Sequence, residues 1–221
     1  MTTKGILMSG PMVRGLLDDL KTQTRRVLRR QPNPKCTEAF QGADGIWRFS
    51  RPTALDPISY SDDDMVTPYL VGDRLYVREA WRCYKGLDIL PPREISQHGK
   101  IHYEADGSPH PHLHFGKFRQ GMHQPRWASR LWLEITDVRV QRVQDITKQD
   151  AIAEGIGQNV LHDAYRDYGP ETPAQQLGFQ DARRSFHSLW DSLNAKRGHG
   201  WDANPWVAAY TFTVHRGNVD G

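Results

Sequence analysis

The sequence is poor in cysteine and contains no long apolar run. Its two cysteines, Cys36 and Cys83, are too few for the disulfide framework that small secreted domains usually need. No stretch approaches the roughly 20 apolar residues that cross a bilayer. The apolar run at residues 6–8 is too short for a signal peptide. We therefore expect a cytoplasmic protein without a membrane partner and without disulfide cross-links.

A strong charge of one sign is also missing. The net charge is +3 and the isoelectric point is about 8.9, which is compatible with a nucleotide or nucleic-acid partner without being diagnostic of one. Aromatic side chains are more informative, because the chain has seven tryptophans and several adjoin arginine. Such pairs can form stacking platforms for bases, although the commoner role of any single tryptophan is in the core. The adjoining pairs are Trp47 with Arg48, Trp81 with Arg82, and Trp127 with Arg126.

The apolar spacing predicts short strands and helices without repeated strand–helix–strand units. Val13, Leu16, Leu17 and Leu20 share one helical face after a capping Ser9, and this helix is expected to end near residue 21. The pattern favours an α+β fold in which a small mixed β-barrel carries flanking helices. We expect one domain over residues 1–221, with insertions at about 31–70 and 85–124. Further strands are predicted at 22–28, 46–49, 75–79, 101–103, 131–140 and 210–214, and further helices at 147–156 and 186–193.

One strand carries a change of phase. Leu131, Leu133 and Ile135 alternate, and after residues 136–137 the apolar positions move to Val138 and Val140. A shift of one residue is typical of a bulge or a tight bend.

The basic stretch at residues 21–26 combines groups that can perform chemistry. A partly desolvated lysine amine, Lys21, can act as a base for a nearby hydroxyl such as that of Thr24. The neighbouring Arg25 and Arg26 can hold a phosphate or the carbonyl of a base. On a strand, Thr24 and Arg26 share one face, whereas Arg25 lies on the other with Gln23. The competing interpretation is a solvated basic helix end, which the helix dipole would favour.

The second insertion is rich in histidine. His110, His112 and His114 alternate, so an extended chain would place them on one face, where they could bind a metal. Metal ligands usually need an anchoring scaffold, and this segment has the composition of a loop, so a zinc site is not favoured.

Four blocks, at residues 72–81, 125–130, 150–156 and 201–207, resemble in their order a group of phage and prophage proteins of the ASCH (activating-signal-cointegrator homology) family. This family belongs to the PUA-like superfamily, and the similarity covers most of the chain outside the insertions. The resemblance implies a PUA-like β-barrel with helices along one side and a cleft for a nucleobase or a nucleic-acid strand.

Some members of this family are small amidohydrolases that deacylate N4-acetylcytidine. The resemblance places their Lys-x-x-Thr pair at Lys21 and Thr24 and their acidic residue at Glu154, with Glu79 as a rival for the acidic role. Thr24 would attack the amide carbonyl and Lys21, with a pKa lowered by burial and by a neighbouring arginine, would accept its proton. Glu154 would orient the amine or protonate the leaving nitrogen, and neither a metal nor a cofactor is required. Substrate-binding roles are expected for Arg25, Arg26, Glu79, Trp81, Arg126 and Trp127.

Two other functions remain open at this point. The protein could be an RNA-binding or modified-base-binding module that stacks bases without chemistry, in which case Lys21 and Arg25 would contact phosphate. It could also be a single-strand ribonuclease that uses histidine or lysine as acid and base. Across these three functions, the expected partner is a nucleoside, a modified base, or single-stranded RNA or DNA.

Overall fold

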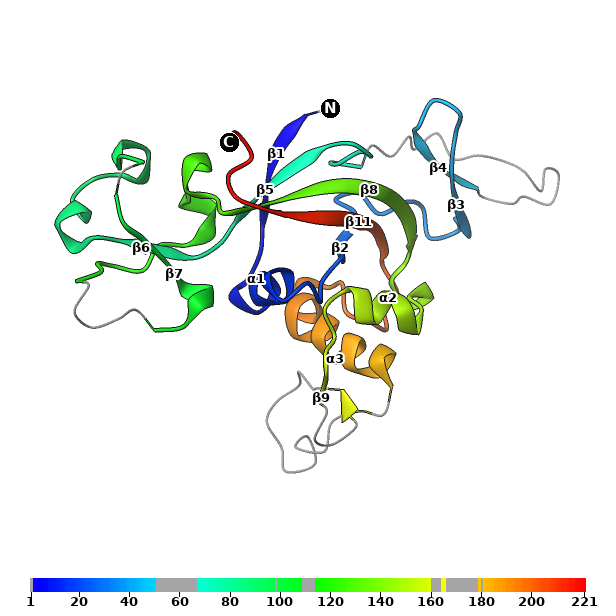
Figure 1. Ribbon diagram of the computed structural model, residues 1–221. Coiled ribbons are helices and arrows are strands. Elements are labelled where there is room, and N and C mark those ends of the chain that lie inside the picture. Colours follow the sequence, from blue (N-terminus) through cyan, green and yellow to red (C-terminus); the bar gives the residue numbers. More distant parts are fainter. Residues whose placement is uncertain are drawn as a thin grey trace. The chain divides into compact units, whose positions relative to one another are not determined.

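The structure is a computed structural model that describes residues 2–50, 67–97, 99–108, 114–159, 164–165, 179 and 181–221 (Figure 1). The chain forms two compact units. The first unit comprises Met1–Thr22, Val71–Thr136 and Phe212–Gly221, and the second comprises Gln23–Leu70 and Asp137–Thr211. Whether the chain folds as one domain over residues 1–221 stays a prediction.

The first unit is built on three neighbouring strands and one helix. Strand β1 (Thr3–Leu7) runs parallel to β5 (Arg74–Arg78), and β5 pairs antiparallel with the start of β8 (Leu131–Arg142). Alternate residues of these strands, among them Leu75 and Leu133, are buried. The predicted strands at 75–79 and 131–140 are therefore confirmed.

Helix α1 (Gly10–Leu17) begins as predicted, with Ser9 at the N-cap position and a proline in the first turn. It ends earlier than predicted because Asp19 adopts φ 57°, and the N–H groups of Leu20 and Lys21 both donate to the Gly15 carbonyl. Leu20 is consequently 56% exposed, so its predicted place on the buried helical face was wrong.

The second insertion belongs to the first unit and has a small core of its own. Strand β6 (Trp81–Cys83) pairs antiparallel with β7 (Ile101–Tyr103), which confirms the predicted strand at 101–103. Trp81, Cys83 and Ile95 are buried together there. The connections contain the single-turn helices η1 (Lys85–Leu87), η2 (Pro92–Glu94), η3 (Glu104–Asp106), η5 (Gly121–His123) and η6 (Arg126–Ala128).

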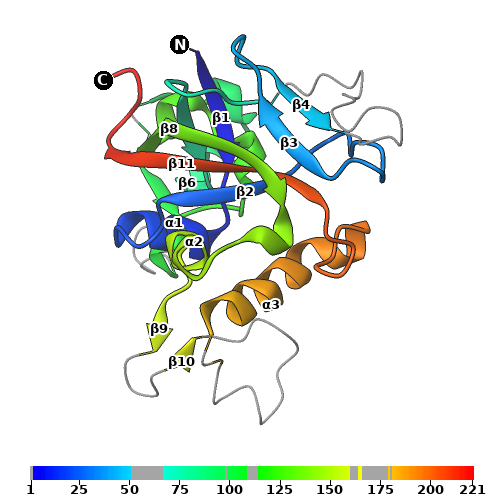
Figure 2. The ribbon, with the colours of Figure 1, turned by 90° about the vertical axis from the view of Figure 1, so that its right-hand side faces the viewer.

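The second unit packs its helices against the short strand β2 (Gln23–Val27), which pairs antiparallel with the first part of β11 (Trp206–Arg216). Helices α2 (Lys148–Ala153) and α3 (Ala182–Asn194) lie side by side (Figure 2). A hairpin of β3 (Glu38–Gln41) and β4 (Trp47–Ser50) includes the strand predicted at 46–49. The remaining elements are η7 (Val143–Asp145), β9 (Gln158–Asn159), β10 (Ala164–Tyr165) and η9 (Ala195–Arg197).

The core of the second unit joins both helices to the strand. Phe186 and Trp190 of α3 pack with Ala151 of α2, and Val27 of β2 packs against them. The helices predicted near 147–156 and 186–193 are confirmed, although Leu193 is 45% exposed.

The sheet is mixed and has the strand order β1-β5-β8-β11-β2. In β8 the buried positions shift after Ile135 to Val138 and Val140, as predicted, and this shift falls where the chain passes from the first unit into the second. The α+β class is thus confirmed, whereas the residues described by the structure form no closed barrel. None of the helices in the described ranges is long and apolar enough to span a membrane.

Candidate active site

Lys21 lies in the first unit, directly after the turn that ends α1. The residue is only 1% exposed, and its backbone N–H donates to the Gly15 carbonyl at 3.0 Å. A solvated helix end would leave the amine in water, so this interpretation of Lys21 was wrong.

Thr24 lies in the second unit, in the middle of β2. It is 1% exposed and stands opposite Tyr210 of β11. Directly opposed residues of an antiparallel pair share one face of the sheet. Thr24 therefore lies on the Tyr210 face, and Arg26 lies there as well because it is two residues further along the strand.

Arg25 points to the other face of β2 and meets two carboxylates. Its Nη1 donates to Glu154 Oε1 at 3.0 Å, and its Nη2 lies 3.1 Å from Asp150 Oδ2. The guanidinium is fully buried, as are most atoms of both acids, so each charge is compensated inside the unit. Nη1 also donates to Gln23 Oε1 at 3.2 Å, which confirms that Gln23 and Arg25 share a face.

Helix α2 supplies both of these acids. The Thr147 hydroxyl accepts from the N–H of Asp150 at 3.0 Å, and the Asp150 side chain reaches back to the N-cap residue, so a capping box starts the helix. Gly155 ends the helix with φ 91°, a conformation that residues with a Cβ rarely adopt. Glu154 thereby stands at the C-terminal end of α2, where a negative charge is unfavourable unless a cation such as Arg25 balances it.

Arg139 adds a second cation to this cluster. Its Nη2 donates to Asp150 Oδ1 at 2.9 Å. Burial would raise the pKa of Asp150, but the hydrogen bond from Arg139 and the charges of Arg25 and Arg139 together lower it to about 2. Asp150 is therefore ionised at neutral pH and helps to fix the position of Arg25.

Arg26 has aromatic neighbours with hydroxyl groups. The rings of Tyr69 and Tyr210 meet edge to face with their centroids 5.2 Å apart. Burial lowers the pKa of Arg26, while the nearby Tyr69, Glu154 and Tyr210 act to raise it. Burial has the opposite effect on the two phenols, whose pKa values it raises, while the charge of Arg26 acts to lower them. The second unit thus holds a cation, two phenols and a carboxylate in a largely desolvated environment.

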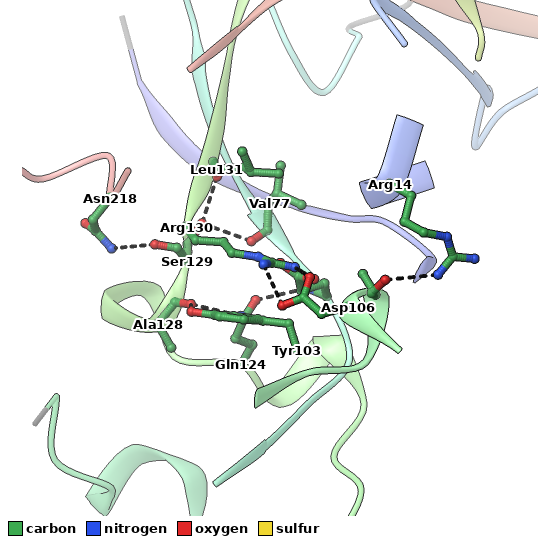
Figure 3. A network of polar contacts seen from close by, with 12 residues as sticks. Arg14, Val77, Tyr103, Asp106, Gln124, Ala128, Ser129, Arg130, Leu131 and Asn218 are labelled. Atoms are coloured by element: carbon green, nitrogen blue, oxygen red, sulfur yellow. Dashed lines mark hydrogen bonds and ion pairs between the residues drawn. The ribbon is translucent and has the colours of Figure 1, made fainter. Parts of the chain in front are cut away.

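Glu79, the rival acid, lies in the first unit just after β5 and is engaged by one arginine. Arg130 Nε donates to Glu79 Oε1 at 2.9 Å, and Arg130 Nη2 donates to Oε2 at 3.0 Å. Arg130 also binds Asp106 and lies over the ring of Tyr103, 4.0 Å from its centroid (Figure 3). Burial raises the pKa of Glu79, although Arg130 opposes this shift. Both carboxylate oxygens are used in this pair.

Backbone contacts complete the surroundings of Glu79. The Gln124 side chain accepts from the Glu79 N–H at 2.9 Å and donates to the Ala128 carbonyl at 3.0 Å (Figure 3). The Tyr103 hydroxyl donates to the same carbonyl at 2.9 Å. These hydrogen bonds connect the second insertion to the sheet of the first unit. The contacts of Glu79 are therefore structural.

The other residues predicted to bind substrate also lie in the first unit. Trp81 is fully buried, and the Arg119 guanidinium stands 5.3 Å from its ring centroid. Trp127 is partly buried against the same small core, which is the environment of a packing residue. Arg126 is 41% exposed and pairs with Asp220.

Of the predicted set, the structure brings Arg25 and Glu154 together, with Arg26 close enough to Glu154 to respond to its charge. Sequence reasoning missed Asp150, Arg139, Tyr69 and Tyr210 as members of this cluster. Only Asp150 carried a local signal, since it lies three residues after the capping threonine.

The alternating histidines that were considered as metal ligands, although a zinc site was not favoured, are only partly described. His110 and His112 lie outside the described residues, and His114 is exposed with φ 47°. No group of three or more metal-binding side chains occurs among the residues that the structure describes.

Comparisons with family models, with curated proteins and with solved structures find no match. The resemblance to the ASCH family thus stays an inference from the sequence blocks.

Proposed function

We propose that the protein is an amidohydrolase that removes the acyl group from N4-acylated cytidine or a related modified nucleoside. The observation that carries the proposal is the burial of an amine, a hydroxyl and a carboxylate at the three positions that resemble the family's catalytic set. Lys21 and Thr24 are each 1% exposed and Glu154 is 7% exposed. Functional sites are places where burial and neighbouring charges act together on ionisable groups.

In this proposal Thr24 Oγ attacks the amide carbonyl carbon while the neutral amine of Lys21 takes the hydroxyl proton. The bond between the carbonyl carbon and N4 breaks, and N4 leaves as an amine after receiving that proton. Water then hydrolyses the acyl ester on Thr24 and releases the carboxylic acid. Glu154, held by Arg25, orients the lysine amine, and Arg26 stabilises the negative charge that develops on the carbonyl oxygen.

The test is the turnover of N4-acetylcytidine by the purified protein, with cytidine and acetate measured by chromatography. Lys21→Ala, Thr24→Ala and Glu154→Gln should each lower kcat/KM by at least about a hundredfold, because each removes a group that acts in the transition state. A stalled acyl intermediate should appear as one added acetyl group on the peptide that contains Thr24.

Two exposed residues provide matched controls. Thr22→Ala removes a neighbouring hydroxyl, and Lys148→Ala removes a solvated amine from α2. Both variants should keep full activity. Equal activity of Lys21→Ala and Lys148→Ala would reject the proposed role of Lys21.

We further propose that the mixed sheet belongs to the PUA-like class. Base binding without chemistry is the second candidate. The cluster of Tyr210, which is buried, with Arg26 and Tyr69, which are partly buried, favours it, because guanidinium and phenol groups are suited to the edges and faces of bases. Binding of N4-acetylcytidine without any release of acetate would select this candidate.

A further inference from the structure

The sheet of the first unit presents aromatic and cationic side chains on the face opposite its apolar core. In β5 and β8 the buried residues Leu75 and Leu133 alternate with Arg74, Tyr76 and Trp132, which are partly exposed. Tyr76 and Trp132 are direct partners across the two strands. We call Arg74, Tyr76, Arg78, Trp132 and His215 the aromatic–arginine face.

The rings on this face are already arranged as a stack. His215 lies on Trp132 with the ring centroids 3.8 Å apart and the planes inclined by 7°. The Arg74 guanidinium stands 5.0 Å from the centroid of Trp132. A base that lies on the outer side of His215, or that replaces Arg74 on Trp132, continues this stack in the same orientation.

Tyr76 extends the face toward β1. An added Cβ on Gly5 would come within 3.0 Å of Cζ of the Tyr76 ring, so the ring lies over the β1 backbone where a side chain is missing. The Arg126 guanidinium stands 5.7 Å from the centroid of this ring. The face therefore offers a second aromatic ring with a cation beside it.

The charges on the face favour an anion. Within the described ranges, neither Arg74 nor Arg78 forms an ion pair, and Arg78 instead contacts the Met122 carbonyl oxygen. The acidic side chain present there is Glu134, whose Oε2 lies 3.4 Å from His215 Nε2. Glu134 stands directly opposite Arg74 across the two strands but is placed against His215. Among the described residues the two arginines therefore have no carboxylate in an ion pair, and beside stacked rings they match a chain of phosphates and bases.

We propose that the aromatic–arginine face binds single-stranded nucleic acid, with bases stacked on Trp132, His215 and Tyr76 and phosphates held by Arg74 and Arg78. A duplex hides the faces of its bases and would leave the rings unused, so a single strand is the occupant that uses both parts of the face. This inference does not depend on the proposed hydrolase chemistry, since it concerns other residues.

The test is fluorescence anisotropy of the full chain with labelled oligouridine and oligothymidine of about 12 nucleotides and with a duplex of the same length. Both single strands should bind at least about tenfold more tightly than the duplex. With two phosphate contacts, log K should fall with log salt with a slope of about −1.4, and Arg74→Gln should reduce the slope by about 0.7.

Trp132→Ala should weaken single-strand binding about tenfold or more, and Trp132→Phe should restore most of it, because a phenyl ring still stacks. Arg93→Gln is the matched control, since this arginine is 85% exposed and belongs to η2 and not to the two strands. Its affinity and salt slope should equal those of the wild type. No single-strand binding, equal duplex binding, or wild-type binding by both Trp132→Ala and Arg74→Gln would each overturn the proposal, whatever the result with N4-acetylcytidine.

Discussion

Removal of Arg130 is the perturbation whose cost follows most directly from the structure. Glu79 has a side chain that is 1% exposed, while that of Arg130 is 24% exposed, and two hydrogen bonds join them. Arg130→Met keeps an unbranched apolar stem but removes the guanidinium, which leaves the Glu79 carboxylate buried without its cation. Breaking a buried pair in this way costs about 3–5 kcal/mol. For a chain of this size the melting temperature should fall by about 6–20 °C.

The loss of stability should depend on pH. Burial raises the pKa of Glu79 above 4.5, and Arg130 opposes this shift. A carboxyl group whose pKa is higher in the folded state contributes stability at low pH, and this contribution is lost as pH rises through the folded pKa. Without Arg130 the folded pKa of Glu79 rises further. The deficit of Arg130→Met should therefore be smallest at low pH and should grow as pH rises above the ordinary glutamate range.

The assay is thermal unfolding followed by tryptophan fluorescence between about pH 5 and pH 8. Arg126→Met is the matched control, because this arginine belongs to the same segment but pairs with the exposed Asp220, a contact worth at most about 1 kcal/mol. Glu79→Gln combined with Arg130→Met should recover much of the loss, since no charge is then buried. A deficit that does not vary with pH, or one no larger than that of Arg126→Met, would refute this account of the pair.

Two further predictions concern the second unit. Arg25→Met should lower the free energy of unfolding in urea by about 3–5 kcal/mol, because Glu154 loses the cation that holds it. For the same reason it should lower the turnover of N4-acetylcytidine. Arg139 has a side chain that is 39% exposed, and Arg139→Met should affect stability alone. Gly155→Ala should lower the free energy of unfolding by about 1–2 kcal/mol, because φ is 91° at this position. Gly157→Ala is the control, since an added Cβ there meets nothing within 4 Å. It should cost less than half as much in the same measurement.

The parts of the fold that were predicted correctly rest on local signals. Thr147 and Asp150 form the capping box that starts α2, and both residues of such a motif lie within one turn. The phase shift in β8 was visible because strand residues alternate between faces. The end of α1 was predicted too late because Leu20 continued the apolar spacing, while the backbone of Asp19 had already left the helix.

The candidate site could be predicted only in part, because its contacts join distant segments. Arg25 and Glu154 are 129 positions apart, and no local spacing relates them. Glu79 and Arg130 are separated by 51 positions, and the sequence gives no sign that one arginine takes both oxygens of the carboxylate. Residue types thus indicated the chemistry available, whereas ion-pair partners depended on how the strands and helices pack.

The partners of the two candidate acids distinguish their roles. Glu79 receives hydrogen bonds from Arg130 on both oxygens, and its neighbours tie an insertion to the sheet, so a ligand could reach this carboxylate only by breaking the network. Glu154 instead stands at the end of a helix and pairs with Arg25 of β2, the strand that also carries Thr24 and Arg26. Its charge acts to raise the pKa of Arg26. For this reason we propose Glu154, and not Glu79, as the carboxylate that orients the amine of Lys21, whereas the contacts of Glu79 are structural.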